Sequence, residues 1–138
     1  MNGKIYLMIR QQFYVEHYWK VIIYYNWNDD FFFPVFKELK RIGFLSKEIK
    51  KIFHALKNNA KAVTCSNIEY HKSITLFNPH PSPQDYLDSI VHEAEHVKQA
   101  MLEAYQVEDK GEPPAYTIGY LLSQMYPVFK DIICGRCL

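Results

Sequence analysis

Residues 92–96 read His-Glu-Ala-Glu-His, an arrangement that suits zinc chemistry. On a helix, residues four apart lie one above the other, with about 6 Å between their Cβ atoms, so His92 and His96 can point at one position. Two imidazole nitrogens placed in this way can bind one Zn²⁺ at about 2.0–2.1 Å. Glu93 would stand beside the ion, where its carboxylate can take a proton from a bound water. The spacing therefore predicts a metal site with a base next to it.

The neighbouring residues predict the helix that this spacing requires. Ser82 suits the N-cap, Pro83 the first helical position, and Asp85 the first turn near the positive end of the helix dipole. The helix can run to about Tyr105. We expect it to bury a stripe made of Leu87, Val91, Ala94, Val97 or the stem of Lys98, Met101 and Tyr105.

A hydrolytic zinc site needs a third protein ligand and leaves the fourth position for water. Glu103 lies seven residues past His96 on the same helix, about 10 Å farther along the axis, and cannot reach. Glu112 follows a polar break at residues 108–111, where the chain can reverse, and it opens the next expected helix. We therefore expect Glu112 to be the third ligand, with Glu108 and Asp109 as alternatives.

The segments HEAEH and Glu-Pro-Pro-Ala-Tyr, residues 112–116, together resemble the gluzincin branch of the zincin metallopeptidases. In that branch the histidine motif is completed by a Glu from a following helix. The expected hairpin before the helix is similar to that of small zincin-like domains, including some encoded by phages and mobile elements. Such domains hold an extended substrate beside the active-site helix by strand addition. The resemblance covers about residues 62–131.

This resemblance implies a hydrolase that cleaves a peptide or protein substrate and binds one Zn²⁺ per chain. His92, His96 and Glu112 would hold the ion, and Glu93 would be the catalytic base. Tyr116 and Tyr120, one and two turns past Glu112, are candidates for a donor to the oxyanion, although packing in the core is an alternative. The residues that could orient a ligand imidazole are Asp85, Asp88 and Glu95.

The rest of the chain predicts one α+β domain over residues 1–138. Aromatic and β-branched residues favour strands at 4–10 and 18–27. Helices are expected from residues 28–30 to Gly43, from an N-cap at Ser46 to about residue 57, and from Glu112 to Asp131. Between them, residues 62–77 favour a hairpin that turns at Ser66-Asn67. The alternation in this hairpin puts Ile74 and Leu76 on one face and Ser73 and Thr75 on the other.

Composition limits the class of protein. The chain has 138 residues, of which 49% are hydrophobic, so it can build one core and is not a disordered tail. It contains neither a signal-peptide pattern nor the ~18 uninterrupted apolar residues of a membrane helix. Three cysteines, an odd number, favour reduced thiols. We therefore expect a soluble, cytoplasmic protein without membrane partners.

Several alternatives compete with the peptidase. Between Lys37 and Lys61, eight Lys or Arg stand against two Glu, a net charge of +6, so helices in residues 31–57 could form a DNA-binding module. Cys65 is a rival ligand, because in peptide deformylase an upstream Cys joins the two histidines; the sequence around it lacks that family's glycine segment. Cys134 and Cys137 form a weak C-x-x-C pair. A protein that keeps zinc only for stability is the remaining alternative.

Overall fold

The computed structural model describes residues 6–134, and its centre is a four-stranded mixed sheet. The strands lie in the order β1-β2-β4-β3; their bounds are β1 (Ile9–Val15), β2 (Trp19–Tyr25), β3 (Ala62–Asn67) and β4 (Lys72–Phe77). β1 pairs with β2 and β3 with β4 in antiparallel fashion, whereas β2 and β4 are parallel. Within the described residues, β3 is therefore an edge strand with one free side.

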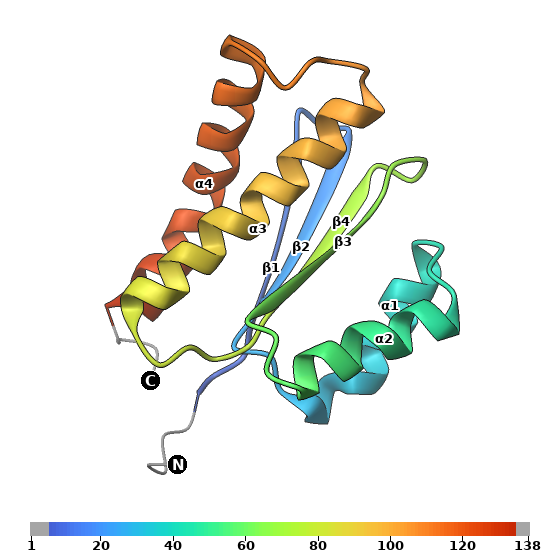
Figure 1. Cartoon of the computed structure of the whole chain (residues 1–138), viewed down its shortest axis with the longest axis vertical. Helices are drawn as coiled ribbons and strands as arrows, with labels where there is room; N and C mark the ends of the chain where they lie inside the picture. The colour runs from blue at the N-terminus through green and yellow to red at the C-terminus, as the bar shows by residue number, and fades with distance from the viewer. Residues whose placement is uncertain (1–5, 135–138) are drawn as a thin grey trace.

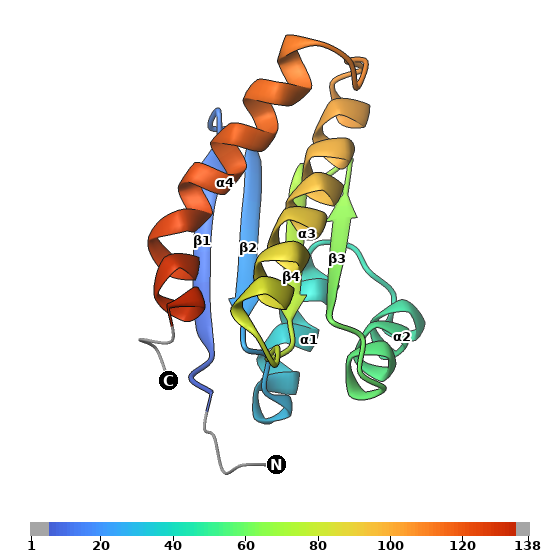
Figure 2. The same cartoon turned by 60° about the vertical axis from the view of Figure 1, so that its left-hand side comes forward.

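Helices cover both faces of this sheet (Figures 1 and 2). The short 3-10 helix η1 (Asp29–Phe31) leads into α1 (Phe32–Arg41), and α1 packs with α2 (Ser46–Lys57) on one face. The two long helices α3 (Pro83–Ala104) and α4 (Glu112–Ile133) pack on the other face. The predicted α+β class is confirmed.

The apolar run of β2 is explained by its central position. Val21, Ile23 and Tyr25 point into the core beneath α3 and α4, while Ile22 and Tyr24 point into the core beneath α1 and α2. All five side chains are buried. A strand covered on both faces is apolar throughout instead of alternating with polar residues.

The start of α3 agrees with the sequence. The Ser82 hydroxyl accepts a hydrogen bond of 3.1 Å from the backbone N–H of Asp85, and Pro83 is the first helical residue. Ser82 therefore satisfies one of the N–H groups that a helix start leaves without a partner.

The rotation of α3 differs from the prediction. Leu87 and Val91 were expected in the buried stripe but are 44% and 42% exposed, whereas Tyr86 and Ile90 are buried against the sheet. Tyr105, at the C-terminal end of the helix, is also 40% exposed. The stripe is shifted because α3 must contact the sheet and α4 at once. Its buried residues therefore cover a wider arc than a single apolar line.

The first strand was predicted too early in the chain. β1 begins at Ile9 and includes the polar residues Arg10, Gln11 and Gln12, while Met1–Ile5 lie outside the described residues. An edge strand can carry polar side chains on alternate positions, and β1 pairs along its whole length with β2, from Ile9–Tyr25 to Val15–Trp19. A strand of this kind has no continuous apolar run, so an apolar run does not mark its start.

The β3–β4 turn and the N-cap of α2 also differ from the predicted positions. β3 continues through Asn67, and the chain turns at residues 68–71, because the Asn67 side chain accepts a hydrogen bond of 3.2 Å from the N–H of Tyr70. The N-cap of α2 is Leu45 rather than Ser46. Its N–H donates to the Glu48 carboxylate at 2.9 Å, so a glutamate three residues later satisfies the cap position.

Candidate metal centre

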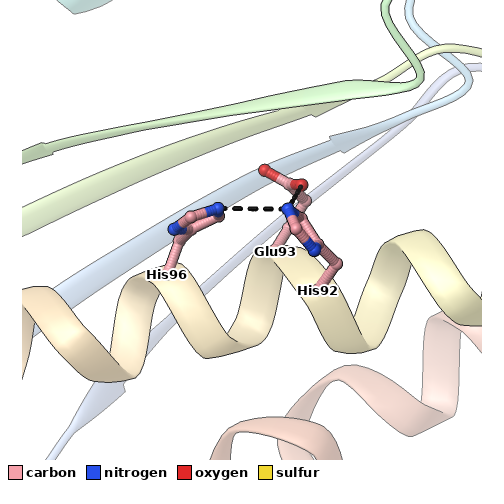
Figure 3. Close-up of side chains that lie close together, drawn as sticks. All are labelled: His92, Glu93 and His96. Atoms are coloured by element: carbon pink, nitrogen blue, oxygen red, sulfur yellow. Dashed lines mark hydrogen bonds and ion pairs between the residues drawn. The ribbon is translucent and has the colours of Figure 1, made fainter.

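His92, Glu93 and His96 come together in the middle of α3, beside the edge strand β3 (Figure 3). Each offers one ligand atom, and these atoms all lie within 4.8 Å of one another. The three side chains line a groove of about 430 Å³ between the helix and the strand. Its other lining residues are Ala62, Val63, Thr64 and Ser66 of β3, and Gln99, Ala100 and Glu103 of α3.

The two histidines face each other. Both imidazoles are exposed, and their Nε2 atoms are 3.2 Å apart. Two nitrogens that bind one ion tetrahedrally at 2.0–2.1 Å lie about 3.3 Å apart. The separation of the two nitrogens is therefore close to the separation that two ligands of one zinc ion require.

Glu93 is buried next to this pair, with 6% of its surface exposed. Its Oε2 atom lies 3.8 Å from Nε2 of His92. Its Oε1 atom accepts a hydrogen bond of 2.9 Å from the hydroxyl of Thr64. The carboxylate is thus held at one oxygen by the strand and presents the other to the histidines.

The hydroxyl of Thr64, which holds Glu93, also contacts a second hydroxyl on the neighbouring strand. Thr64 and Thr75 are cross-strand partners, with their Oγ1 atoms 2.8 Å apart, and Thr75 is buried. Ser66 and Ser73 repeat the arrangement two residues along, at 2.7 Å. Hydroxyls on this face of the hairpin therefore form the polar floor of the groove.

The sequence contained a signal for these hydroxyls, but its meaning was missed. The alternation placed Ser73 and Thr75 on the face opposite Ile74 and Leu76, a pattern typical of a hairpin with one solvated face. In the structure both faces are covered, so these hydroxyls lie under α3. Polar strand residues facing a helix that carries His and Glu were the available clue.

Glu112, the expected third ligand, is not part of the His92–Glu93–His96 group. It is the exposed first residue of α4, and α3 continues for eight residues beyond His96 before the chain reverses. Eight helical residues span about 12 Å. In addition, α3 and α4 pack together in the core that contains Val97 and Met101, whereas the imidazoles face the strands.

Tyr116 also lies apart from the histidines. Its side chain is 74% exposed and lines a larger cavity of about 890 Å³ between the β1–β2 turn, the end of α3 and the start of α4. Tyr105 and Tyr120 line the same cavity, and the Tyr120 hydroxyl donates to the carbonyl of Tyr14 at 3.4 Å. Tyr116 is therefore neither packed in the core nor next to the candidate metal centre.

The other acidic candidates have different positions. Asp109 accepts a hydrogen bond of 2.9 Å from the buried ammonium of Lys98, which also pairs with Glu95. Burial would lower the pKa of Lys98, but the hydrogen bonds that its ammonium donates to these two carboxylates, with their negative charges, raise the pKa overall. Asp109 and Glu95 are thus held by Lys98, outside the groove. Glu108 is exposed in the connection between α3 and α4.

Within residues 6–134, Glu93 is the one carboxylate in contact with the imidazoles: His92 and His96 contact each other, and His92 also contacts Glu93. Asp85 and Asp88 lie one to two turns earlier on α3, outside the lining of the groove. The predicted orienting role of these acids has no contact in this arrangement.

Cys65 points to the other face of the sheet. It packs in the core beneath α1 and α2, away from the groove. Burial, together with the nearby charges of Glu93 and Glu48, raises the pKa of its thiol to about 12. A buried thiol that resists ionisation is a poor metal ligand. Cys134 is exposed at the end of α4, and Cys137 lies outside the described residues.

Comparison with known proteins gives no match: no family model, no curated protein and no solved structure is similar to this chain at the threshold applied. Within residues 6–134, no helix combines the length and apolar character needed to cross a membrane.

Proposed function

We propose that this protein is a zinc-dependent metallopeptidase in which His92 and His96 hold the ion and Glu93 is the catalytic base. The observation that carries the proposal is the pair of Nε2 atoms 3.2 Å apart with a buried carboxylate beside them. Helix spacing brings two histidines together frequently, but burying a carboxylate next to them costs free energy unless it is used or compensated. The resemblance to gluzincins agrees with this assignment.

A bound zinc would lower the pKa of its water towards ~7 and polarise a substrate carbonyl. The chain's own residues have three tasks in this chemistry. His92 and His96 bind through neutral imidazole nitrogens, Glu93 accepts the proton of the attacking water at Oε2, and Thr64 holds Oε1. The free edge of β3 borders the groove, so an extended peptide can pair with it while its backbone passes the histidines.

A third ligand would have to come from outside the groove. Glu112 is the residue that the sequence indicates, and it would reach the histidines only if the start of α4 moved around the end of α3. Residues 105–111 are an exposed connection, and Gly111 has φ +77° with no atoms near the position of a Cβ. A movement there would break the ion pair between Asp109 and the buried Lys98 and would uncover the buried Pro114. Glu112 is therefore a proposed ligand only of a rearranged site, and Glu112→Ala tests whether that rearrangement occurs.

The experiment is metal analysis of the purified protein together with hydrolysis of an unfolded protein such as casein. We expect about one zinc per chain and hydrolysis that a chelator abolishes. Glu93→Gln should keep the zinc and lose hydrolysis by about a hundredfold or more. The matched control is Glu103→Gln, an exposed acid of the same groove, which should keep both. Wild type without zinc under chelator-free conditions would refute the proposal.

The same variants separate the alternative of a zinc that only stabilises the fold. In that case wild type would bind zinc and melt at a higher temperature with it, and Glu93→Gln would do the same, but neither would hydrolyse peptide bonds. We place the reaction in the cytoplasm, as the odd number of cysteines favours.

A second candidate function is suggested by α2. Lys47, Lys50, Lys51 and His54, together with Ala55, line a shallow depression of about 540 Å³ on the side of the sheet away from the histidines. A cationic surface of this kind can bind the phosphates of a nucleic acid. Binding of duplex DNA that weakens steeply with salt and is lost in Lys47→Gln/Lys50→Gln/Lys51→Gln would support it; equal binding by the variant would exclude it.

A further inference from the structure

Glu93 is placed where it could play either of two roles. Its carboxylate oxygen lies within 4.8 Å of the ligand nitrogens of both His92 and His96, so distance alone would allow it to bind the same ion. A carboxylate bound to the ion cannot at the same time receive the proton of a water. Some feature of the chain must decide between ligand and base.

The contact that distinguishes the two roles is the hydrogen bond from Thr64. Its hydroxyl donates to Oε1 of Glu93 at 2.9 Å, while Oε2 faces the histidines. Because both oxygens belong to one rigid carboxylate, a swing that brings Oε2 onto the ion would pull Oε1 away from Thr64. Because Glu93 is 6% exposed, water cannot readily replace the lost donor. The buried position therefore makes this bond a strong restraint.

Thr64 is itself rigidly held. It is a β-branched residue in β3, so its χ1 angle is restricted, and its backbone pairs with Thr75 of β4. Each threonine hydroxyl has a single proton. Since Thr64 gives its proton to Glu93, the 2.8 Å contact with Thr75 must be donated by Thr75. The bonds therefore run in one direction, from Thr75 to Thr64 to Glu93.

We propose that Thr64 is a positioning residue that keeps Glu93 off the metal and so makes it a base instead of a ligand. Thr75 assists by orienting the Thr64 hydroxyl. This inference rests on the proposed metallopeptidase function, but it concerns a residue of the strand that the histidine motif does not include.

The test uses the full chain loaded with Co²⁺, whose visible absorption weakens when the number of ligands rises above four. Thr64→Val removes the hydroxyl and keeps the side-chain shape, and Thr64→Ser keeps a hydroxyl. We expect Thr64→Val to bind Co²⁺ at least as tightly as wild type, with weaker visible absorption, because Glu93 joins the ligands. Thr64→Ser should restore the wild-type spectrum.

Casein hydrolysis by the zinc-loaded proteins gives a second measurement. We expect kcat of Thr64→Val to fall by about 10- to 100-fold with little change in KM, the effect of losing one hydrogen bond to a charged group. Thr64→Ser should recover most of this loss, and Thr75→Val should lose less than Thr64→Val. Thr117→Val is the matched control and should leave kcat unchanged, because the Thr117 hydroxyl bonds to the carbonyl of Pro113 in α4, outside the groove.

The outcomes separate the two proposals. If wild type binds no metal, the proposed function fails and this inference fails with it. If wild type binds Co²⁺ and hydrolyses casein, but Thr64→Val has the same spectrum and kcat as wild type, only the positioning role is overturned. Should Thr64→Val not fold, as judged by circular dichroism, Thr64→Ala makes the same test with a smaller side chain.

Discussion

The groove and the cavity beside α3 differ in size and in the side chains that line them, and the smaller one holds the titratable groups. The β3–α3 groove is the smaller, at about 430 Å³, yet it holds both histidines, the buried Glu93 and the hydroxyl of Thr64. The cavity at the junction of α3 and α4 is about twice as large, and it is lined by tyrosines, small residues and apolar side chains, with Glu16 as the one carboxylate that residues 6–134 contribute. Chemistry follows the groups that converge, and volume alone does not locate it.

The comparison also separates the two halves of the expected site. His92, Glu93 and His96 lie in the groove, whereas Tyr116 lies in the cavity and Glu112 precedes it at the start of α4. Residues four apart on a helix must share a face, whatever the rest of the fold does. A residue sixteen positions later depends on where the helix ends and on which side the next helix packs.

The largest expected effect is on metal binding in the groove. His96→Ala should weaken zinc binding by on the order of 100-fold or more, because one of two facing nitrogens is removed. Competition with a chromophoric chelator measures the affinity. His54→Ala, on α2, is the control and should leave it unchanged; equal affinities in both variants would locate the metal elsewhere.

A second effect concerns the stability of the fold and the loop that precedes α3. Buried His80 lies between the carbonyl of Asn78 and the hydroxyl of Ser89, each at 2.7 Å. Burial lowers its pKa, more than the hydrogen bond to Asn78 raises it, so the unfolded chain takes up the proton first as the pH falls. The stabilisation from neutral His80 is therefore full above about pH 6.5 and is lost below it.

Urea unfolding between pH 7.5 and 5 measures this dependence. The free energy of unfolding of wild type should fall with pH more steeply than that of His80→Gln, which cannot take up the proton. Parallel curves for the two proteins would show that His80 is not the group responsible.

A smaller effect is expected in the cavity. Gly119 lies within α4 and lines the cavity, and a Cβ there would meet no atom within 4 Å. Gly119→Ala should therefore raise the free energy of unfolding by about 0.5–1 kcal/mol, the helix preference of Ala over Gly, and leave zinc affinity unchanged. Destabilisation in urea would contradict the open space beside Gly119.

The smallest effect, if the described arrangement persists when metal binds, is that of Glu112→Ala. Zinc affinity should then equal that of wild type, because Glu112 lies outside the histidine group. A loss of tenfold or more would show instead that the start of α4 moves to the groove and supplies the third ligand. This variant thus shows whether a residue from the start of α4, near the cavity, binds the metal in the groove.

The sequence predicted the parts of this molecule that local rules determine. Ser82 and Pro83 fixed the start of α3, and the spacing of His92 and His96 fixed their common face. The prediction failed where residues far apart in the sequence determine which side chains are buried. β1 was misplaced because its polar residues are acceptable only at a sheet edge, and Leu87 was misjudged because α4 determines which side of α3 is covered.

The support for Glu93 could not be predicted for the same reason. Thr64 and Glu93 are 29 residues apart, and only the packing of α3 across the hairpin brings them together. A threonine in a strand is ordinary by itself. The sequence indicates that Thr75 and Ser73 need hydrogen-bond partners if a helix covers their face of the hairpin. It does not indicate that a helix covers that face.

The uninterrupted length of α3 makes it a stiff element that connects the groove with the cavity. Its 22 residues form a rod of about 33 Å, with the histidines near the middle and the tyrosine-lined cavity at the C-terminal end. β3, by contrast, is tied to β4 along its length. Because α3 is one continuous helix, the groove and the cavity share a single stiff element, and a tilt of its C-terminal end would change the distance between Glu93 and Thr64.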